Sequence, residues 1–144
     1  MGFFKAYDMR GTYGVDFDCG YVRRIGAELA GLLAGKSGVP AGRAPRVLVG
    51  RDCRVTSPAV RDALVAGLEE AGAEVTDLGQ CTTPMAYFFT AEDGYDGSVM
   101  VTASHNPPGD NGLKVSMRTS LPVGYADGLD EVEARVGAFA GGAS

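Results

Sequence analysis

The chain has 144 residues, of which 45% are hydrophobic and 22% charged, and its formal net charge is −5 at pH 7. This length fits one domain with a proper core, and the negative charge without a basic patch excludes nucleic-acid binding from the expected functions. Three widely spaced cysteines favour a reducing cytoplasm over a disulfide framework, and the sequence contains neither a signal-peptide pattern nor an apolar run long enough to span a membrane.

The amino-terminal segment, residues 3–14, contains a cluster of charged and aromatic side chains. Lys5, Tyr7, Asp8 and Arg10 precede a glycine at position 11. Taken alone, this pattern is typical of an edge strand whose polar residues face water. The functional alternative assigns Arg10 to a phosphate group, because a guanidinium can hold two phosphate oxygens at once.

Helical and extended patterns then alternate along the chain. An apolar stripe predicts a helix over residues 19–34, and a short apolar run predicts a buried strand over 46–50. Ser57 followed by Pro58 predicts the N-cap and first position of a second helix, which Gly72 ends. Three glycines inside these helical patterns indicate close packing of helices against a sheet: Gly26, Gly31 and Gly67.

The alternation continues after the second helix. Residues 74–78 and 98–102 predict strands, and a helix is expected to start at Thr83-Pro84. Three apolar side chains of this helix are predicted to lie in the core: Met85, Phe88 and Phe89.

The carboxyl-terminal third completes the pattern. Residues 113–117 alternate as a strand, and the tight connection to the preceding strand predicts an antiparallel edge. Residues 127–139 predict a last helix, and 141–144 a flexible end. The chain, residues 1–144, is thus expected to form a single α/β domain, a three-layer α/β/α sandwich with a mixed, mostly parallel sheet. The predicted apolar stripe of the last helix consists of Leu129, Val132, Val136 and Phe139.

The loop between the last two strands is the most informative segment. Ser104, His105 and Asn106 follow the buried strand, a double proline stiffens the loop, and Lys114 comes one short turn later. In open α/β sheets, ligands bind at the carboxyl ends of the strands. Phosphoryl transfer requires positioning and charge neutralisation more than covalent chemistry from the protein. The segment therefore indicates a serine that carries a phosphoryl group in an electropositive loop.

Two other interpretations of this loop are open. Ser-His-Asn can be a polar turn that satisfies its own backbone. A serine hydrolase fits worse, because Ser104 lacks the flanking glycines of a nucleophile elbow and His105 is the next residue along the chain.

Cations must gather locally if a chain with net negative charge is to bind a phosphate group. The Gly-Arg-Asp run at 50–52 ends a predicted strand. Arg51 and Asp52 can bind within the site, or they can pair with each other or with loop backbone, and a structural pair is favoured. The cations that can gather are Lys5, Arg10, Arg51, Arg54 and Lys114.

Four motifs in order resemble the α-D-phosphohexomutases, the family of phosphomannomutases and phosphoglucomutases. Residues 7–11 resemble the family's Tyr-Asp-[Ile/Val]-Arg-Gly opening, and 49–52 its Gly-Arg-Asp strand end. Residues 102–107, Thr-Ala-Ser-His-Asn-Pro, match the phosphoserine signature, and 111–114 resemble the Asn-Gly-[Phe/Leu/Ile]-Lys sequel.

The resemblance implies roles for particular residues. Ser104 would carry the phosphoryl group and complete a Mg²⁺ site through its phosphate. Arg10, His105 and Lys114 would line the reaction centre as catalytic residues, and Tyr7 and Asn106 would contact the substrate side, Asn106 by orienting the loop. The implied reaction interconverts hexose 1-phosphate and 6-phosphate, of mannose or glucose, through a 1,6-bisphosphate that also serves as activator.

The resemblance covers the family's domain 1 only. The acidic metal loop, the sugar-selecting loop and the distal phosphate-binding loop of the family are absent from this sequence, so the missing carboxyl-terminal domains are expected as partners. The alternative is a free-standing phosphosugar-binding module without complete mutase activity. A third hypothesis, an interaction protein in which the loop is a relic, is disfavoured by the retained residues of the loop.

Overall fold

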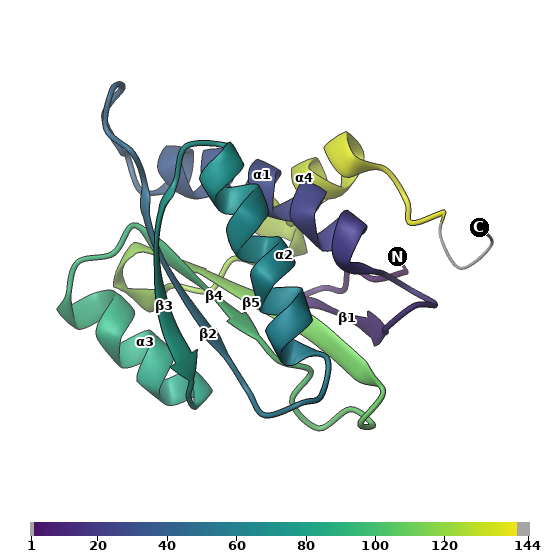
Figure 1. Cartoon of the computed structure of the whole chain (residues 1–144). Coiled ribbons are helices and arrows are strands. Elements are labelled where there is room, and N and C mark those ends of the chain that lie inside the picture. The colour runs from purple at the N-terminus through teal and green to yellow at the C-terminus, as the bar shows by residue number, and fades with distance from the viewer. Residues whose placement is uncertain (1, 141–144) are drawn as a thin grey trace.

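A computed structural model describes residues 2–140, so the flexible end predicted at 141–144 lies outside the described residues. A five-stranded sheet in the order β1-β5-β4-β2-β3 forms the centre of the structure (Figure 1). Three helices cover one face of this sheet and a fourth covers the other. The predicted α/β/α sandwich is therefore confirmed.

The strands explain why one end of the sheet collects the motifs. β2 (Arg46–Arg51) pairs in parallel with β3 (Glu74–Gln80) and β4 (Gly97–Val101). β5 (Asp110–Met117) runs antiparallel to both of its neighbours, β4 and β1 (Met9–Thr12). Only β5 is reversed, so the sheet is mixed and mostly parallel, as predicted. The same end of the sheet therefore carries the carboxyl ends of β1, β2, β3 and β4.

One prediction about the sheet is wrong. The strand predicted at 113–117 is not an edge strand, because β1 pairs with its free side and is itself the edge. The amino-terminal segment returns to β5 from about a hundred residues away. No local pattern in the sequence specifies that pairing.

The helices form the two outer layers. α1 (Cys19–Lys36), α2 (Ser57–Glu70) and α4 (Leu129–Val136) lie on one face, and α3 (Thr83–Glu92) lies on the other (Figure 1). The main core fills the space between the first layer and the sheet. It includes Val22, Ile25, Leu29, Leu64, Leu68, Val47, Val49, Val99, Val101 and Leu113.

Two details of the helices differ from the predictions. The N-cap of α2 is Thr56, because Ser57 is already helical and its hydroxyl turns to Asp52 instead. In α3, Met85 is 45% exposed and Phe88 59% exposed, so neither is a core residue. This helix buries its small side chains, Ala86 and Thr90, against the sheet.

The helix glycines pack helix against helix rather than helix against sheet. A Cβ on Gly26 would stand 2.7 Å from the carbonyl oxygen of Leu64, and one on Gly67 would stand 2.0 Å from the carbonyl oxygen of Arg23. The backbones of α1 and α2 therefore touch at this crossing. Gly31 has no such neighbour within 4 Å.

The last helix follows its prediction in part. α4 ends at Val136, earlier than predicted, and its apolar stripe of Leu129, Val132 and Val136 is buried. Phe139 lies beyond the helix but still packs on Tyr21, with ring centroids 5.3 Å apart. Within residues 2–140, no helix combines the length and the apolar character that crossing a membrane requires.

A buried carboxylate at the other end of the sheet makes stability depend on pH. Burial of Asp96 favours its neutral form, but hydrogen bonds from Arg43, from the backbone N–H of Arg46 and from Arg118 outweigh this and hold its pKa at about 2. Its ordinary value is 3.8, so the ionised carboxylate stabilises the fold above pH 4. That contribution, about 2 kcal/mol, is lost as the pH falls from about 4 to about 2.

The substitution Asp96→Asn should therefore lower the free energy of unfolding at pH 7 more than at pH 2. Urea unfolding of both proteins across this range measures the difference. A difference that stays constant with pH would show that the charge of Asp96 does not stabilise the fold.

Candidate functional site

Ser104 lies on the loop between β4 and β5, directly beyond the carboxyl end of β4. Its φ is +54°, a left-handed conformation that is uncommon for a residue with a side chain. The loop holds it there through Thr102, whose hydroxyl accepts a hydrogen bond from the Ser104 N–H at 3.0 Å. Ser104 is exposed, and within residues 2–140 its hydroxyl has no hydrogen-bond partner. The hydroxyl is thus presented to solvent from a constrained backbone.

The side chain of Arg10, on the edge strand β1, reaches this loop. Its Nε forms an ion pair with Asp8 at 2.9 Å, and one terminal nitrogen donates to the Asn106 side-chain oxygen at 3.1 Å. The Asn106 amide in turn donates to Asp110 at 3.0 Å. Both ends of the Asn106 side chain are therefore occupied.

Lys114 shares a face of the sheet with Arg10. Arg10 stands opposite Gly112 across β1 and β5, and Lys114 is two residues further along β5. Side chains two residues apart on a strand point to the same face. Lys114 also stands opposite Met100, near the carboxyl end of β4, so Ser104, Arg10 and Lys114 converge on one end of the sheet.

A close backbone contact explains why position 112 of the Asn-Gly-Leu-Lys motif is a glycine. A Cβ at this position would stand 2.0 Å from the carbonyl oxygen of Met9. The close approach of β1, which brings Arg10 to the loop, therefore requires glycine here.

The side chains of His105 and Tyr7 are exposed and make fewer contacts. His105 is exposed beside Ser104, and Tyr7 is 86% exposed in the segment that precedes β1. Neither side chain makes a hydrogen bond among the described residues. Their predicted roles in the site stay predictions.

The Gly-Arg-Asp motif forms different contacts from those expected. Arg51 donates to the backbone oxygen of Asp52 at 3.2 Å, whereas the Asp52 carboxylate pairs with Arg54 at 3.3 Å. Asp52 also accepts hydrogen bonds from the Ser57 hydroxyl at 2.6 Å and from the Arg54 N–H at 3.1 Å. Of the alternatives predicted for this pair, Arg51 makes a contact with loop backbone, whereas the carboxylate of Asp52 pairs with Arg54 and not with Arg51.

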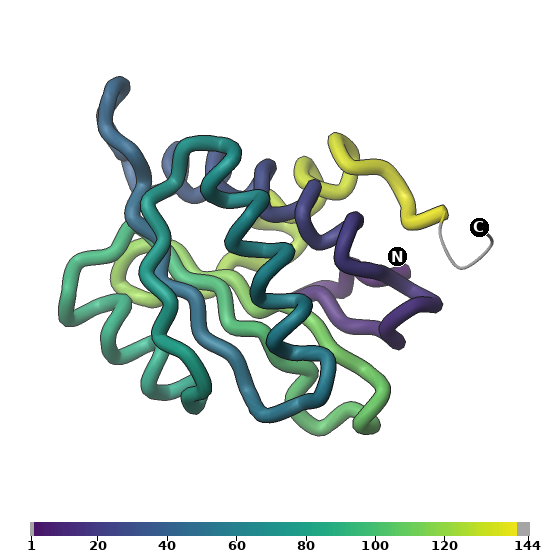
Figure 2. Tube along the Cα trace, in the orientation of Figure 1, coloured from purple at the N-terminus to yellow at the C-terminus, as the bar shows by residue number. Residues whose placement is uncertain are grey.

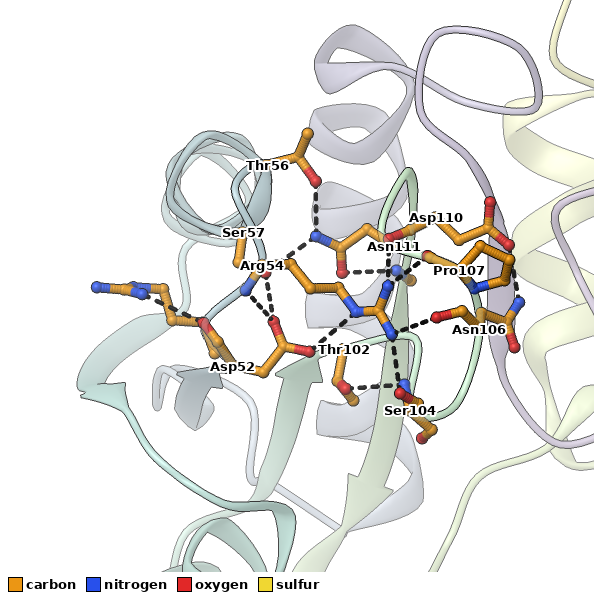
Figure 3. A network of polar contacts seen from close by, with 12 residues as sticks. Asp52, Arg54, Thr56, Ser57, Thr102, Ser104, Asn106, Pro107, Asp110 and Asn111 are labelled. Atoms are coloured by element: carbon orange, nitrogen blue, oxygen red, sulfur yellow. Dashed lines mark hydrogen bonds and ion pairs between the residues drawn. The ribbon is translucent and has the colours of Figure 1, made fainter.

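Arg54 is the residue that sequence reasoning undervalued. Its guanidinium lies at the centre of the polar network in Figure 3, between the start of α2 and the Ser104 loop. The tube in Figure 2 shows why: the connection from β2 to α2 runs beside the loop between β4 and β5. The spacing of Asp52 and Arg54 after a strand end was the available signal. It does not reveal which loop the side chain meets.

The predicted magnesium site can be compared with the acidic, histidine and cysteine side chains that the structure describes. Among residues 2–140, no group of three or more histidine, cysteine, aspartate or glutamate side chains is placed to hold a metal ion. A phosphate on Ser104 would offer oxygen ligands, which Mg²⁺ prefers.

The site is also separate from a cavity elsewhere on the molecule. A cavity of about 600 Å³ lies between α1 and α4, lined by residues that include Gly31, Leu32 and Val132. The Ser104 loop contributes nothing to its lining. The candidate site therefore lies outside this cavity.

Comparisons with known proteins point to one family. Residues 1–138 match the family described as "Phosphoglucomutase/phosphomannomutase, alpha/beta/alpha domain I". A phosphomannomutase of Vibrio cholerae is 43% identical over 131 residues, which are 91% of this chain and 27% of that protein. A protein of Xanthomonas campestris named "Phosphohexose mutases" is 41% identical over 135 residues, or 94% of this chain and 28% of that one.

Solved structures agree with these relatives. A phosphoglucomutase/phosphomannomutase family protein from Burkholderia thailandensis superposes with a TM-score of 0.76 at 33% identity, covering 94% of this chain and 30% of that one. A structure from Thermus thermophilus gives a TM-score of 0.79 at 28% identity, covering 93% and 29%. The chain spans less than a third of the length of each of these proteins.

Proposed function

Because the chain belongs to the phosphoglucomutase/phosphomannomutase family, as its α/β/α domain I, we propose that it is the phosphoserine-bearing domain of a phosphohexomutase. The enzyme would interconvert hexose 1-phosphate and hexose 6-phosphate, with mannose, glucose or both as the sugar. One observation carries the proposal: an exposed Ser104 hydroxyl on a braced loop, at the sheet end where Arg10 and Lys114 also lie.

The proposed reaction consists of two phosphoryl transfers. A hydroxyl oxygen of the hexose phosphate attacks the phosphorus of phospho-Ser104, the bond from phosphorus to Oγ breaks, and the sugar becomes a 1,6-bisphosphate. The proton of the attacking hydroxyl leaves as the new bond forms, and Oγ takes up a proton. After the bisphosphate reorients, the reverse transfer returns its other phosphoryl group to Ser104.

Two cations have distinct roles in this scheme. The guanidinium of Arg10 is planar and can hold two phosphate oxygens at once, so it stabilises charge on the transferring phosphoryl group. Asp8 and Asn106 occupy two of its five N–H donors, and the described residues supply no partner for the rest. Lys114 is able to exchange a proton and is assigned to proton handling.

The other site residues complete the proposed reaction centre. His105 is adjacent to the phosphoryl carrier, and Tyr7 extends from the edge beside β1 with most of its ring free to meet a substrate. Asn106 joins Arg10 to Asp110, so it would hold the guanidinium and the loop in a fixed relative position.

The cofactor and partners follow from the family. A Mg²⁺ ion bound through the Ser104 phosphate would offset phosphate charge, with its other ligands in the part of the relatives that this chain does not cover. That part would also supply sugar selection, and glucose or mannose 1,6-bisphosphate would prime Ser104. We place the enzyme in the cytoplasm, where its three free cysteines would stay reduced.

Mapping the phosphoryl group tests the proposal. A hybrid enzyme is made in which this chain replaces the matching part of the Vibrio cholerae phosphomannomutase, and it is incubated with Mg²⁺ and glucose 1,6-bisphosphate. Peptide mass spectrometry should find one phosphoryl group on Ser104, and the hybrid should exchange mannose 1-phosphate with mannose 6-phosphate.

Two outcomes would count against this function. Phosphorylation at another residue would remove Ser104 from the mechanism. A folded hybrid that binds mannose 6-phosphate but neither exchanges it nor becomes phosphorylated would favour the phosphosugar-binding module.

A further inference from the structure

Arg54 contacts four backbone carbonyl groups of the segment that carries Ser104. One terminal nitrogen donates to the carbonyl oxygens of Ser104 at 2.8 Å and Asn106 at 2.9 Å. The other donates to those of Pro107 at 2.6 Å and Asp110 at 3.1 Å. The planar guanidinium therefore binds carbonyl groups from both ends of the loop (Figure 3).

These four hydrogen bonds and one ion pair with Asp52 engage all three nitrogens of the guanidinium. A guanidinium has five N–H donors and no acceptor. Four of them face the loop carbonyls, and the fifth, on Nε, faces the Asp52 carboxylate at 3.3 Å. The side chain is only 12% exposed. Arg54 thus has no donor left for a phosphate, in contrast to Arg10.

The guanidinium is itself anchored from the side of α2. Asp52 holds it and also accepts from the Ser57 hydroxyl at 2.6 Å. The Asn111 amide, fully buried at the start of β5, donates to Ser57 at 3.0 Å and to Thr56 at 2.9 Å. Two strand ends and one helix start are tied together, so the loop cannot shift without breaking several of these bonds.

We propose that Arg54 is a positioning residue, which fixes the Ser104 oxygen for phosphoryl transfer through its hold on the loop carbonyls and does not contact the substrate. This inference rests on the proposed function of Ser104. Misplacing a reacting atom by about 1 Å can slow a reaction about 10²-fold, so loss of the guanidinium should act on the chemical step.

The test compares Arg54→Lys with Arg61→Gln in the hybrid enzyme. Lysine keeps the charge, but its ammonium is a single point with three donors and cannot span four carbonyls. Arg54→Lys should therefore lower kcat for mannose 1-phosphate by about 10²-fold and leave KM nearly unchanged. In the chain alone, the amides of Ser104, Asn106 and Asp110 should exchange hydrogen faster.

Arg61 provides the matched control. It lies on α2, the helix that follows Arg54 along the chain, its side chain is 20% exposed, and it pairs with Asp62 and Asp77 away from the loop. Arg61→Gln removes two ion pairs that lie outside the loop, so it should leave kcat and the exchange of the loop amides unchanged.

The outcomes separate the inference from the function on which it rests. Wild-type kcat in Arg54→Lys, or a large rise in KM with kcat unchanged, would overturn the positioning role and indicate a simple charge or a phosphate contact. If Ser104 takes up no phosphoryl group in the unsubstituted hybrid, the proposed function fails instead. Faster amide exchange in Arg54→Lys would then still establish its hold on the loop.

Discussion

Replacing Ser104 with alanine should abolish mutase activity in the hybrid enzyme while leaving the fold intact. The substitution removes the oxygen that would accept and return the phosphoryl group, and removal of a covalent nucleophile typically lowers kcat by about 10⁴-fold or more. The Ser104 hydroxyl has no hydrogen-bond partner among residues 2–140, so its loss should change the free energy of unfolding by less than about 1 kcal/mol. The exchange of mannose 1-phosphate with mannose 6-phosphate measures the loss of activity, and urea unfolding measures the change in stability.

Ser120 offers the control for this experiment. It follows the opposite end of β5, its backbone is also left-handed with φ +61°, and its hydroxyl donates to the carbonyl oxygen of Tyr87. Ser120→Ala should retain full exchange activity. Activity that survives Ser104→Ala and falls in Ser120→Ala would refute the assignment of the phosphoryl carrier.

Gly67→Ala should cause one of the largest losses of stability available from adding a single methyl group. The new Cβ would stand 2.0 Å from the Arg23 carbonyl oxygen and 3.0 Å from the Ala27 nitrogen, and both are backbone atoms of α1. The two helices must separate to make room, at a cost that exceeds the gain in helix propensity from alanine, about 1 kcal/mol. We expect the free energy of unfolding to fall by about 2–3 kcal/mol, measured by urea or thermal unfolding.

Gly31→Ala isolates the helix-propensity contribution. Gly31 lies inside α1 and is exposed, and a methyl group added there would meet no neighbouring atom within 4 Å. This substitution should stabilise the chain by up to about 1 kcal/mol. If both variants change stability equally, the contact between α1 and α2 does not require a glycine.

Several predictions that depended on local periodicity were confirmed. The apolar stripes of α1 and α2 and the buried run of β4 were visible because burial on one face imposes a spacing that a window of the sequence contains. Where burial depends on the partner layer, the same reasoning failed. Met85 and Phe88 are apolar and regularly spaced, yet the sheet takes up the small side chains of α3 instead.

The candidate site shows the same division. Ser104 and its stiff loop could be found from the order of the residues, and Arg10 and Lys114 from their charge and their place beside strands. The Arg54 network could not be found in this way, because its partners lie about 50 residues away in sequence and are backbone carbonyls, which carry no residue identity.

The sequence by itself determined the alternation of strands and helices, the α/β class and the segment that presents a serine at a strand end. Short-range sterics and hydrophobic spacing control these features, and both depend on residues that are close together in the sequence. Only the tertiary structure decided that β1 covers the outer side of β5 and that Arg54, rather than Arg51, pairs with Asp52. Those choices depend on which distant surfaces meet when the sheet assembles, and buried polar groups then pair with whatever partner that assembly brings within reach.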